Sequence, residues 1–148
     1  MSERTESTVV VGALPAQVLE VIADFESYPD WTGAVKDARV LATGGDGRPA
    51  QVRFVLDAGA IKDTYTLGYR WEVDAAGVGI VTWSLLESQV LKALDGLYEL
   101  TSSGDAGTRV RYALTVDLRV PMLGMLRRKA EKVIIDAALN ELKKRVEA

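Results

Sequence analysis

The sequence contains no histidine and no cysteine among its 148 residues. Without cysteine the chain forms no disulfides and no thiolate metal sites, and it has no thiol nucleophile. Without histidine it lacks the commonest general base and the commonest metal ligand. We therefore expect neither a metal nor a cofactor, and the usual groups for acid–base catalysis are largely missing.

The sequence also lacks a basic surplus and a long apolar run. Its formal net charge is −3, whereas binding to duplex nucleic acid requires a basic stripe. No apolar segment approaches the ~20 residues that a membrane-spanning helix needs. The opening residues, MSERTEST, are polar and unlike a signal peptide. We expect a cytoplasmic protein with one domain over residues 1–148 and no nucleic-acid partner; the sequence does not predict its oligomeric state.

The chain is predicted to begin with a short strand and a short helix. Glu6 to Val11 fits a strand, and Pro15 suits the first position of a helix, where its missing N–H costs nothing. Apolar residues at positions 18, 19, 22 and 25 recur at helical spacing. Pro29 ends this helix, and we interpret residues 32–36 as one further helical turn.

The middle of the chain is predicted to be a sheet, because from Val35 onward the apolar residues recur with a period of two. One face of residues 51–57 and of residues 61–72 is apolar while the other is polar, which is typical of an antiparallel sheet covered on one side. Glycine-rich turns separate the strands. The predicted strands span residues 39–43, 51–57, 61–72, 79–87, 91–101 and 108–119.

The end of the chain is predicted to be one long helix. Pro121 ends the strands, and the helix begins at about Leu123. The fold class that follows is α+β: a curved antiparallel β-sheet wrapped around a long C-terminal α-helix, with short helices after the first strand. The apolar stripe of the long helix consists of Leu126, Ala130, Val133, Ile134, Ala137, Ala138 and Leu142.

Four short motifs occur along this pattern: Pro15-Ala16-Gln17-Val18, Asp24-Phe25-Glu26-Ser27-Tyr28-Pro29-Asp30-Trp31, Gly96-Leu97-Tyr98-Glu99-Leu100 and Gly107-Thr108-Arg109-Val110. In this order and spacing the chain resembles the START-like (SRPBCC) superfamily, specifically its bacterial polyketide cyclase/dehydrase and lipid-transport branch, over nearly its whole length. The resemblance implies a helix-grip fold with a cavity between sheet and helix that takes lipids, polyketides or similar molecules. Because this fold serves binding proteins and cyclases alike, it does not decide the function.

The interior of the predicted sheet is rich in aromatic side chains. They form either a ligand cavity with phenol hydroxyls for orientation or a solid core in which each hydroxyl is satisfied locally. The resemblance favours the cavity. From strand parity and the helix stripe, the predicted ligand-binding residues are Phe54, Leu56, Asp63, Tyr65, Leu67, Tyr69, Trp83, Tyr98, Tyr112, Leu114, Met122, Leu126, Ala130 and Ile134.

Two of these predictions have alternatives. On a cavity wall Asp63 would orient a polar group or act as a base, whereas at the strand end it would be solvated. Residues 120–126 (VPMLGML) precede the basic triplet Arg127-Arg128-Lys129. Residues 120–129 form either a lid at the cavity mouth in transient contact with a membrane surface, or the buried first turn of the helix with solvated charges behind it.

The sequence leaves the function open between two main classes. One is non-enzymatic binding or transport of a hydrophobic small molecule, such as a lipid, a quinone or a polyketide-like compound. The other is a polyketide aromatase/cyclase or dehydratase, which needs acid–base groups in the cavity. Parity places the strand arginines on the outer face, so we favour binding and assign no catalytic residue. A protein-interaction module is a third interpretation.

Overall fold

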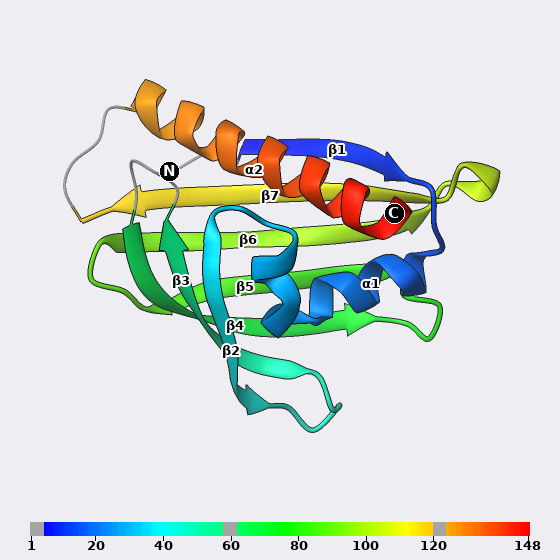
Figure 1. The fold of residues 1–148 in the computed structure, drawn as a ribbon, viewed down its shortest axis with the longest axis horizontal. Coiled ribbons are helices and arrows are strands. Elements are labelled where there is room, and N and C mark those ends of the chain that lie inside the picture. Colours follow the sequence, from blue (N-terminus) through cyan, green and yellow to red (C-terminus); the bar gives the residue numbers. More distant parts are fainter. Residues whose placement is uncertain (1–4, 58–61, 120–123) are drawn as a thin grey trace.

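The computed structural model describes residues 5–57, 62–119 and 124–148 and confirms the predicted α+β helix-grip fold (Figure 1). Seven antiparallel strands form one sheet in the order β1-β7-β6-β5-β4-β3-β2, so that β1 lies beside β7 and the other neighbours are consecutive in the chain. The elements are β1 (Thr5–Val11), α1 (Pro15–Ala23), the 3-10 helix η1 (Phe25–Asp30), β2 (Val35–Thr43), β3 (Pro49–Asp57), β4 (Lys62–Val73), β5 (Gly79–Glu87), β6 (Leu91–Ser102), the 3-10 helix η2 (Gly104–Ala106), β7 (Thr108–Leu118) and α2 (Gly124–Glu147).

The segment after α1 differs from the prediction. Pro29 lies within η1, and the helical turn predicted over residues 32–36 is wrong, because β2 already begins at Val35. Val35 pairs with Leu56 of β3, so the ladder with the neighbouring strand overrides the local preference of this segment. The chain between η1 and β2 is therefore a short turn that faces the interior of the fold.

The sheet bends around its inner face. Irregular pairings interrupt the ladders between β2 and β3, β4 and β5, and β6 and β7. Such bulges bend a strand and increase its twist. The helices α1 and α2 lie on the same inner face, and α2 runs across β1 and β7 (Figure 1).

The buried stripe of α2 differs from the predicted one. Its fully or almost fully buried positions are Glu131, Ile135, Leu139 and Leu142, which recur every three or four residues. Of the predicted stripe, Leu142 is buried, whereas Val133 is 62% exposed. The helix is thus rotated so that a charged residue enters the core.

Glu131 is buried because both of its carboxylate oxygens have donors. The hydroxyl of Thr5 donates to Oε1 at 2.6 Å, and the backbone N–H of Val116 donates to Oε2 at 2.6 Å. These bonds connect α2 to β1 and β7, and they satisfy a carboxylate that is 0% exposed.

Candidate ligand-binding site

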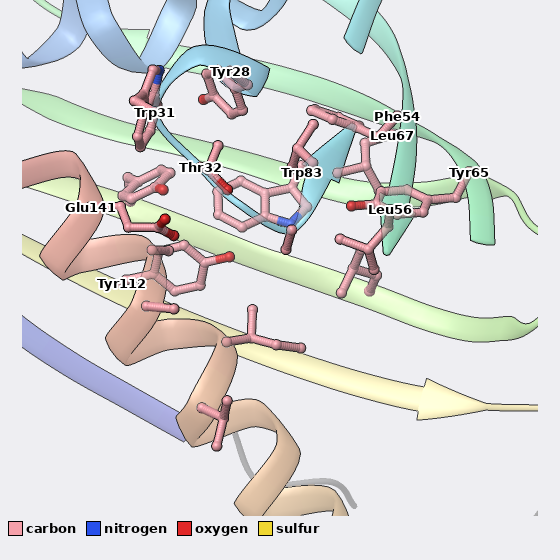
Figure 2. Close-up of a pocket in the computed structure, with 18 of the residues that line it drawn as sticks. Tyr28, Trp31, Thr32, Phe54, Leu56, Tyr65, Leu67, Trp83, Tyr112 and Glu141 are labelled. Carbon is pink, nitrogen blue, oxygen red and sulfur yellow. The ribbon is translucent and has the colours of Figure 1, made fainter. Parts of the chain in front are cut away.

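A cavity of about 310 Å³ lies between the inner face of the sheet, α2 and the turn that joins η1 to β2 (Figure 2). Its volume is at the lower end of the range of ~300–1,000 Å³ found for small-molecule sites. The predicted residues that line it are Phe54, Leu56, Tyr65, Leu67, Tyr69, Trp83, Tyr98, Tyr112 and Ile134.

Of the other predicted residues, Leu114 and Asp63 do not line the cavity, whereas three fall on parts of the chain that the structure does not describe. Leu114 is fully buried in the core beneath it. Met122 and the side chains of Leu126 and Ala130 lie outside the described residues. The same holds for most of the predicted lid, while Arg128 and Lys129 are exposed on α2.

Asp63 lies at the start of β4 and contacts the β5–β6 turn rather than the cavity. It accepts a hydrogen bond from the hydroxyl of Ser88, whose Oγ in turn accepts from the N–H groups of Val90 at 3.1 Å and Leu91 at 2.7 Å. Arg119 donates to the carbonyl oxygen of Ser88 at 3.1 Å. These bonds fix the connection between β5 and β6, so a structural role accounts for Asp63.

Sequence reasoning missed the part of the wall that comes from the η1–β2 turn and, on α2, Glu141. Val133, Ala137 and Ala138 belong to the predicted helix stripe but were not among the predicted ligand-binding residues. Tyr28 and Trp31 stand in the second motif, in which Pro29 is predicted to end a helix and no residue is predicted to contact a ligand. No periodic pattern marks the turn. The additional lining residues are Tyr28, Trp31, Thr32, Ala34, Val35, Leu94, Val133, Ala137, Ala138 and Glu141.

The aromatic residues of the wall contact one another in a continuous series. The ring centroids of Trp83 and Tyr98 are 5.4 Å apart, and those of Tyr98 and Tyr112 are 4.7 Å apart in an edge-on arrangement. Tyr69 joins the series through Trp83 at 5.9 Å. Such packing gives a large and rigid apolar surface.

All five tyrosines of the sequence have raised phenol pKa values. Burial is the main cause for each pKa, and charge on neighbouring tyrosines adds to it for all except Tyr112. Charge on Tyr112 contributes to the raised pKa of each of the other four. The phenols therefore remain neutral hydrogen-bond donors at physiological pH.

Only one of these hydroxyls is paired within the described part of the chain. Tyr28 donates to the carbonyl oxygen of Ile22 at 2.5 Å. The hydroxyls of Tyr65, Tyr69, Tyr98 and Tyr112 have no hydrogen-bond partner among the described residues. They are free to donate to a molecule in the cavity.

Among the described residues that line the cavity, Glu141 is the one charged side chain. Its Oε2 accepts a hydrogen bond from the N–H of Gly33 at 3.0 Å, which joins α2 to the η1–β2 turn. Figure 2 shows Glu141 with Thr32 and Tyr112 at one end of the cavity, and Leu56 and Leu67 at the other. The cavity therefore has a polar end at Glu141 and a mainly apolar end, where the phenol hydroxyl of Tyr65 also lies.

The described residues contain neither a metal-binding cluster nor a membrane-spanning helix. No group of three or more acidic side chains in residues 5–57, 62–119 and 124–148 is arranged to hold a metal ion. No helix within these ranges has the length and apolar character needed to cross a bilayer.

The sequence matches the family described as polyketide cyclase / dehydrase and lipid transport over residues 11–143. The chain therefore belongs to this family of START-like proteins. A comparison with curated protein sequences gave no match.

Solved structures with a similar fold include a START superfamily protein from Mycobacterium smegmatis, with 21% identity, a TM-score of 0.89 and coverage of 99% of this chain and 98% of the other. A protein from Thermus thermophilus has 23% identity, a TM-score of 0.78 and coverage of 97% of each chain. The Zhui aromatase/cyclase from a Streptomyces species has 18% identity, a TM-score of 0.72 and coverage of 98% of this chain and 93% of its own. At these identities the likeness shows the fold.

Proposed function

We propose that the protein binds a hydrophobic small molecule in the cavity between the sheet and α2. The observation that carries this proposal is that the hydroxyls of Tyr65, Tyr98 and Tyr112 have no partner among the described residues, although these residues are only 6–7% exposed. A buried hydroxyl without a partner costs free energy, so a solid core would normally satisfy it. A ligand with acceptor oxygens would satisfy these hydroxyls instead.

The cavity's two ends define the kind of ligand. An apolar body would fill the space beside Leu56, Leu67 and Trp83, and an oxygen atom near Tyr98 and Tyr112 would accept hydrogen bonds. Lipids, quinones and polyketide-like compounds have this character, and the family description names both lipid transport and polyketide chemistry. A volume of about 310 Å³ favours a compact ligand over a long-chain one.

An aromatase/cyclase or dehydratase activity is the second candidate. Two observations support it: the carboxylate of Glu141 in a wall of phenols, and the likeness of the fold to Zhui. Such chemistry must remove and return protons. Because their pKa values are raised, the phenols can donate but cannot act as bases near neutral pH. Glu141 would be the single described base, so we place binding first.

Native mass spectrometry of protein purified from its own host tests the proposal. We expect a fraction of the protein to show the added mass of a bound compound, and extraction with organic solvent should remove that compound. Ala138→Phe places a ring into the cavity and should abolish this species, whereas Ala76→Phe on the exposed β4–β5 turn should retain it. Equal occupancy in wild type and Ala138→Phe would contradict the proposed site. Conversion of the bound compound by wild type and not by Glu141→Gln would favour the enzyme.

A further inference from the structure

We infer that the cavity binds hydrophobic ligands with a protonated amine in preference to those with a carboxylate. Glu141 is the residue that determines this preference. This inference rests on the proposed binding function and adds the charge of the ligand to it. Three features of the polar end carry it: a positioned carboxylate, the lack of a compensating cation and a surround of aromatic rings.

The carboxylate of Glu141 is held in place by a hydrogen bond to one of its two oxygens. Its Oε2 accepts from the N–H of Gly33 at 3.0 Å, and this bond orients the side chain across the mouth of the cavity. Its Oε1 has no hydrogen-bond or ion-pair partner within the described part of the chain. A ligand ammonium could bond to this second oxygen, and charge-assisted hydrogen bonds of this kind are about twice as strong as neutral ones.

No described lysine or arginine forms an ion pair with Glu141. Arg145, one turn further along α2, lines a neighbouring hollow with Trp31 and does not line the cavity. Lys36 donates to the carbonyl oxygen of Gly33 at 2.8 Å and does not line the cavity. Lys143, two residues along α2, donates to the carbonyl oxygen of Val10 at 2.8 Å and to Glu147 at 2.6 Å. A ligand carboxylate at this end would meet the like charge of Glu141, which is partly buried.

Aromatic rings lie at the same end as Glu141. Tyr28 and Trp31 are in edge-on contact, with centroids 4.9 Å apart, and both line the cavity. Figure 2 shows Trp31 on the same side of the cavity as Glu141. The faces of such rings attract cations, and the attraction grows when the site is shielded from water. The rings therefore favour the same sign of ligand charge as the carboxylate.

The experiment compares three probes with one hydrocarbon body: naphthylpropylamine, naphthylpropanol and naphthylpropanoate. Their affinities are measured by isothermal titration calorimetry at neutral pH and low salt. For wild type we expect the amine to bind at least about tenfold more tightly than the carboxylate, which corresponds to ~1.4 kcal/mol. In Glu141→Gln the amide oxygen can still accept from Gly33, and the affinities for the amine and the carboxylate should agree within about threefold. The affinity for the alcohol should also stay within about threefold of the wild-type value.

Glu72→Gln on the exposed face of β4 removes the same charge far from the cavity and should leave the preference unchanged. Equal binding of the amine and the carboxylate by wild type would overturn the inference. Binding of the alcohol in the same experiment would still support the proposed binding function. Retention of the amine preference in Glu141→Gln would also overturn it. Failure of all three probes to bind wild type would contradict the binding function itself.

Discussion

The indole of Trp83 packs against Gly96, its partner across β5 and β6. A methyl group on Gly96 would lie 2.6 Å from Cζ2 of Trp83 and 2.6 Å from the carbonyl oxygen of Ala113. Only glycine leaves room at this position for an indole that lines the cavity. The glycine of the third sequence motif therefore shapes the wall of the site.

Gly96→Ala should lower the free energy of unfolding by about 1–3 kcal/mol, because the added carbon forces either Trp83 or the backbone of β7 to shift. Urea denaturation followed by circular dichroism measures this change. Gly45→Ala is the matched control, since a methyl group there meets nothing within 4 Å. Equal stability of the two variants would show that the Trp83 wall has space to spare.

The tyrosines should divide into two kinds when their hydroxyls are removed. Tyr28→Phe loses the hydrogen bond to the carbonyl oxygen of Ile22 and should lower the free energy of unfolding by about 1 kcal/mol or more. Tyr112→Phe loses no bond to a described residue, so stability should stay within about 0.5 kcal/mol while naphthylpropanol affinity falls. Chemical denaturation and calorimetry measure the two effects. The opposite order of stabilities would mean that Tyr112 is a structural residue.

Glu131 should be essential for stability although it lies outside the cavity wall. Glu131→Ala leaves the hydroxyl of Thr5 and the N–H of Val116 without their acceptor, and we expect a loss of about 2–4 kcal/mol. Thr5→Ala removes one donor and should cost about 1 kcal/mol. Thermal and urea denaturation measure both losses. Glu72→Ala is the exposed control, and its free energy of unfolding should stay within about 0.5 kcal/mol of wild type.

Alkaline pH should destabilise the protein through its tyrosines. Their folded-state pKa values are raised above the ordinary value of 10.0, so the unfolded chain loses its phenol protons first. The unfolded state then binds fewer protons, and the free energy of unfolding falls as pH rises above about 10. Phenolate absorbance should appear together with the loss of the circular dichroism signal. Phenolate formation at pH 10 in protein that is still folded would contradict the buried positions of these rings.

The sequence was sufficient to predict the sheet's contribution to the site. In a strand the period of two decides the face, so the pattern correctly placed Phe54, Tyr65, Tyr98 and Tyr112 inside. Parity also put Asp63 on that face, but it could not show that the β5–β6 turn would bring Ser88 to it at the end of the strand.

The rest depended on contacts that a single sequence does not display. Trp31 and Val35 reach the cavity from an irregular turn whose path is set by the pairing of β2 with β3. The rotation of α2 depends on Glu131, whose buried position is favourable only because Thr5 and Val116 supply donors. The apolar pattern of α2 marks neither carboxylate, so the prediction included neither the buried Glu131 nor Glu141, which gives the cavity its polar end.

The three tryptophans of the sequence provide the most direct measurement of ligand binding in the cavity. Trp31 and Trp83 line it, whereas Trp71 does not; the indole N–H of Trp71 donates to the carbonyl oxygen of Pro49 at 2.7 Å. We would titrate isotope-labelled protein with naphthylpropanol and follow the three indole N–H resonances by NMR. Saturable shifts of Trp31 and Trp83, with Trp71 nearly unchanged, are the predicted result. Shifts confined to Trp71, or no saturable shift of Trp31 and Trp83, would contradict binding in the cavity.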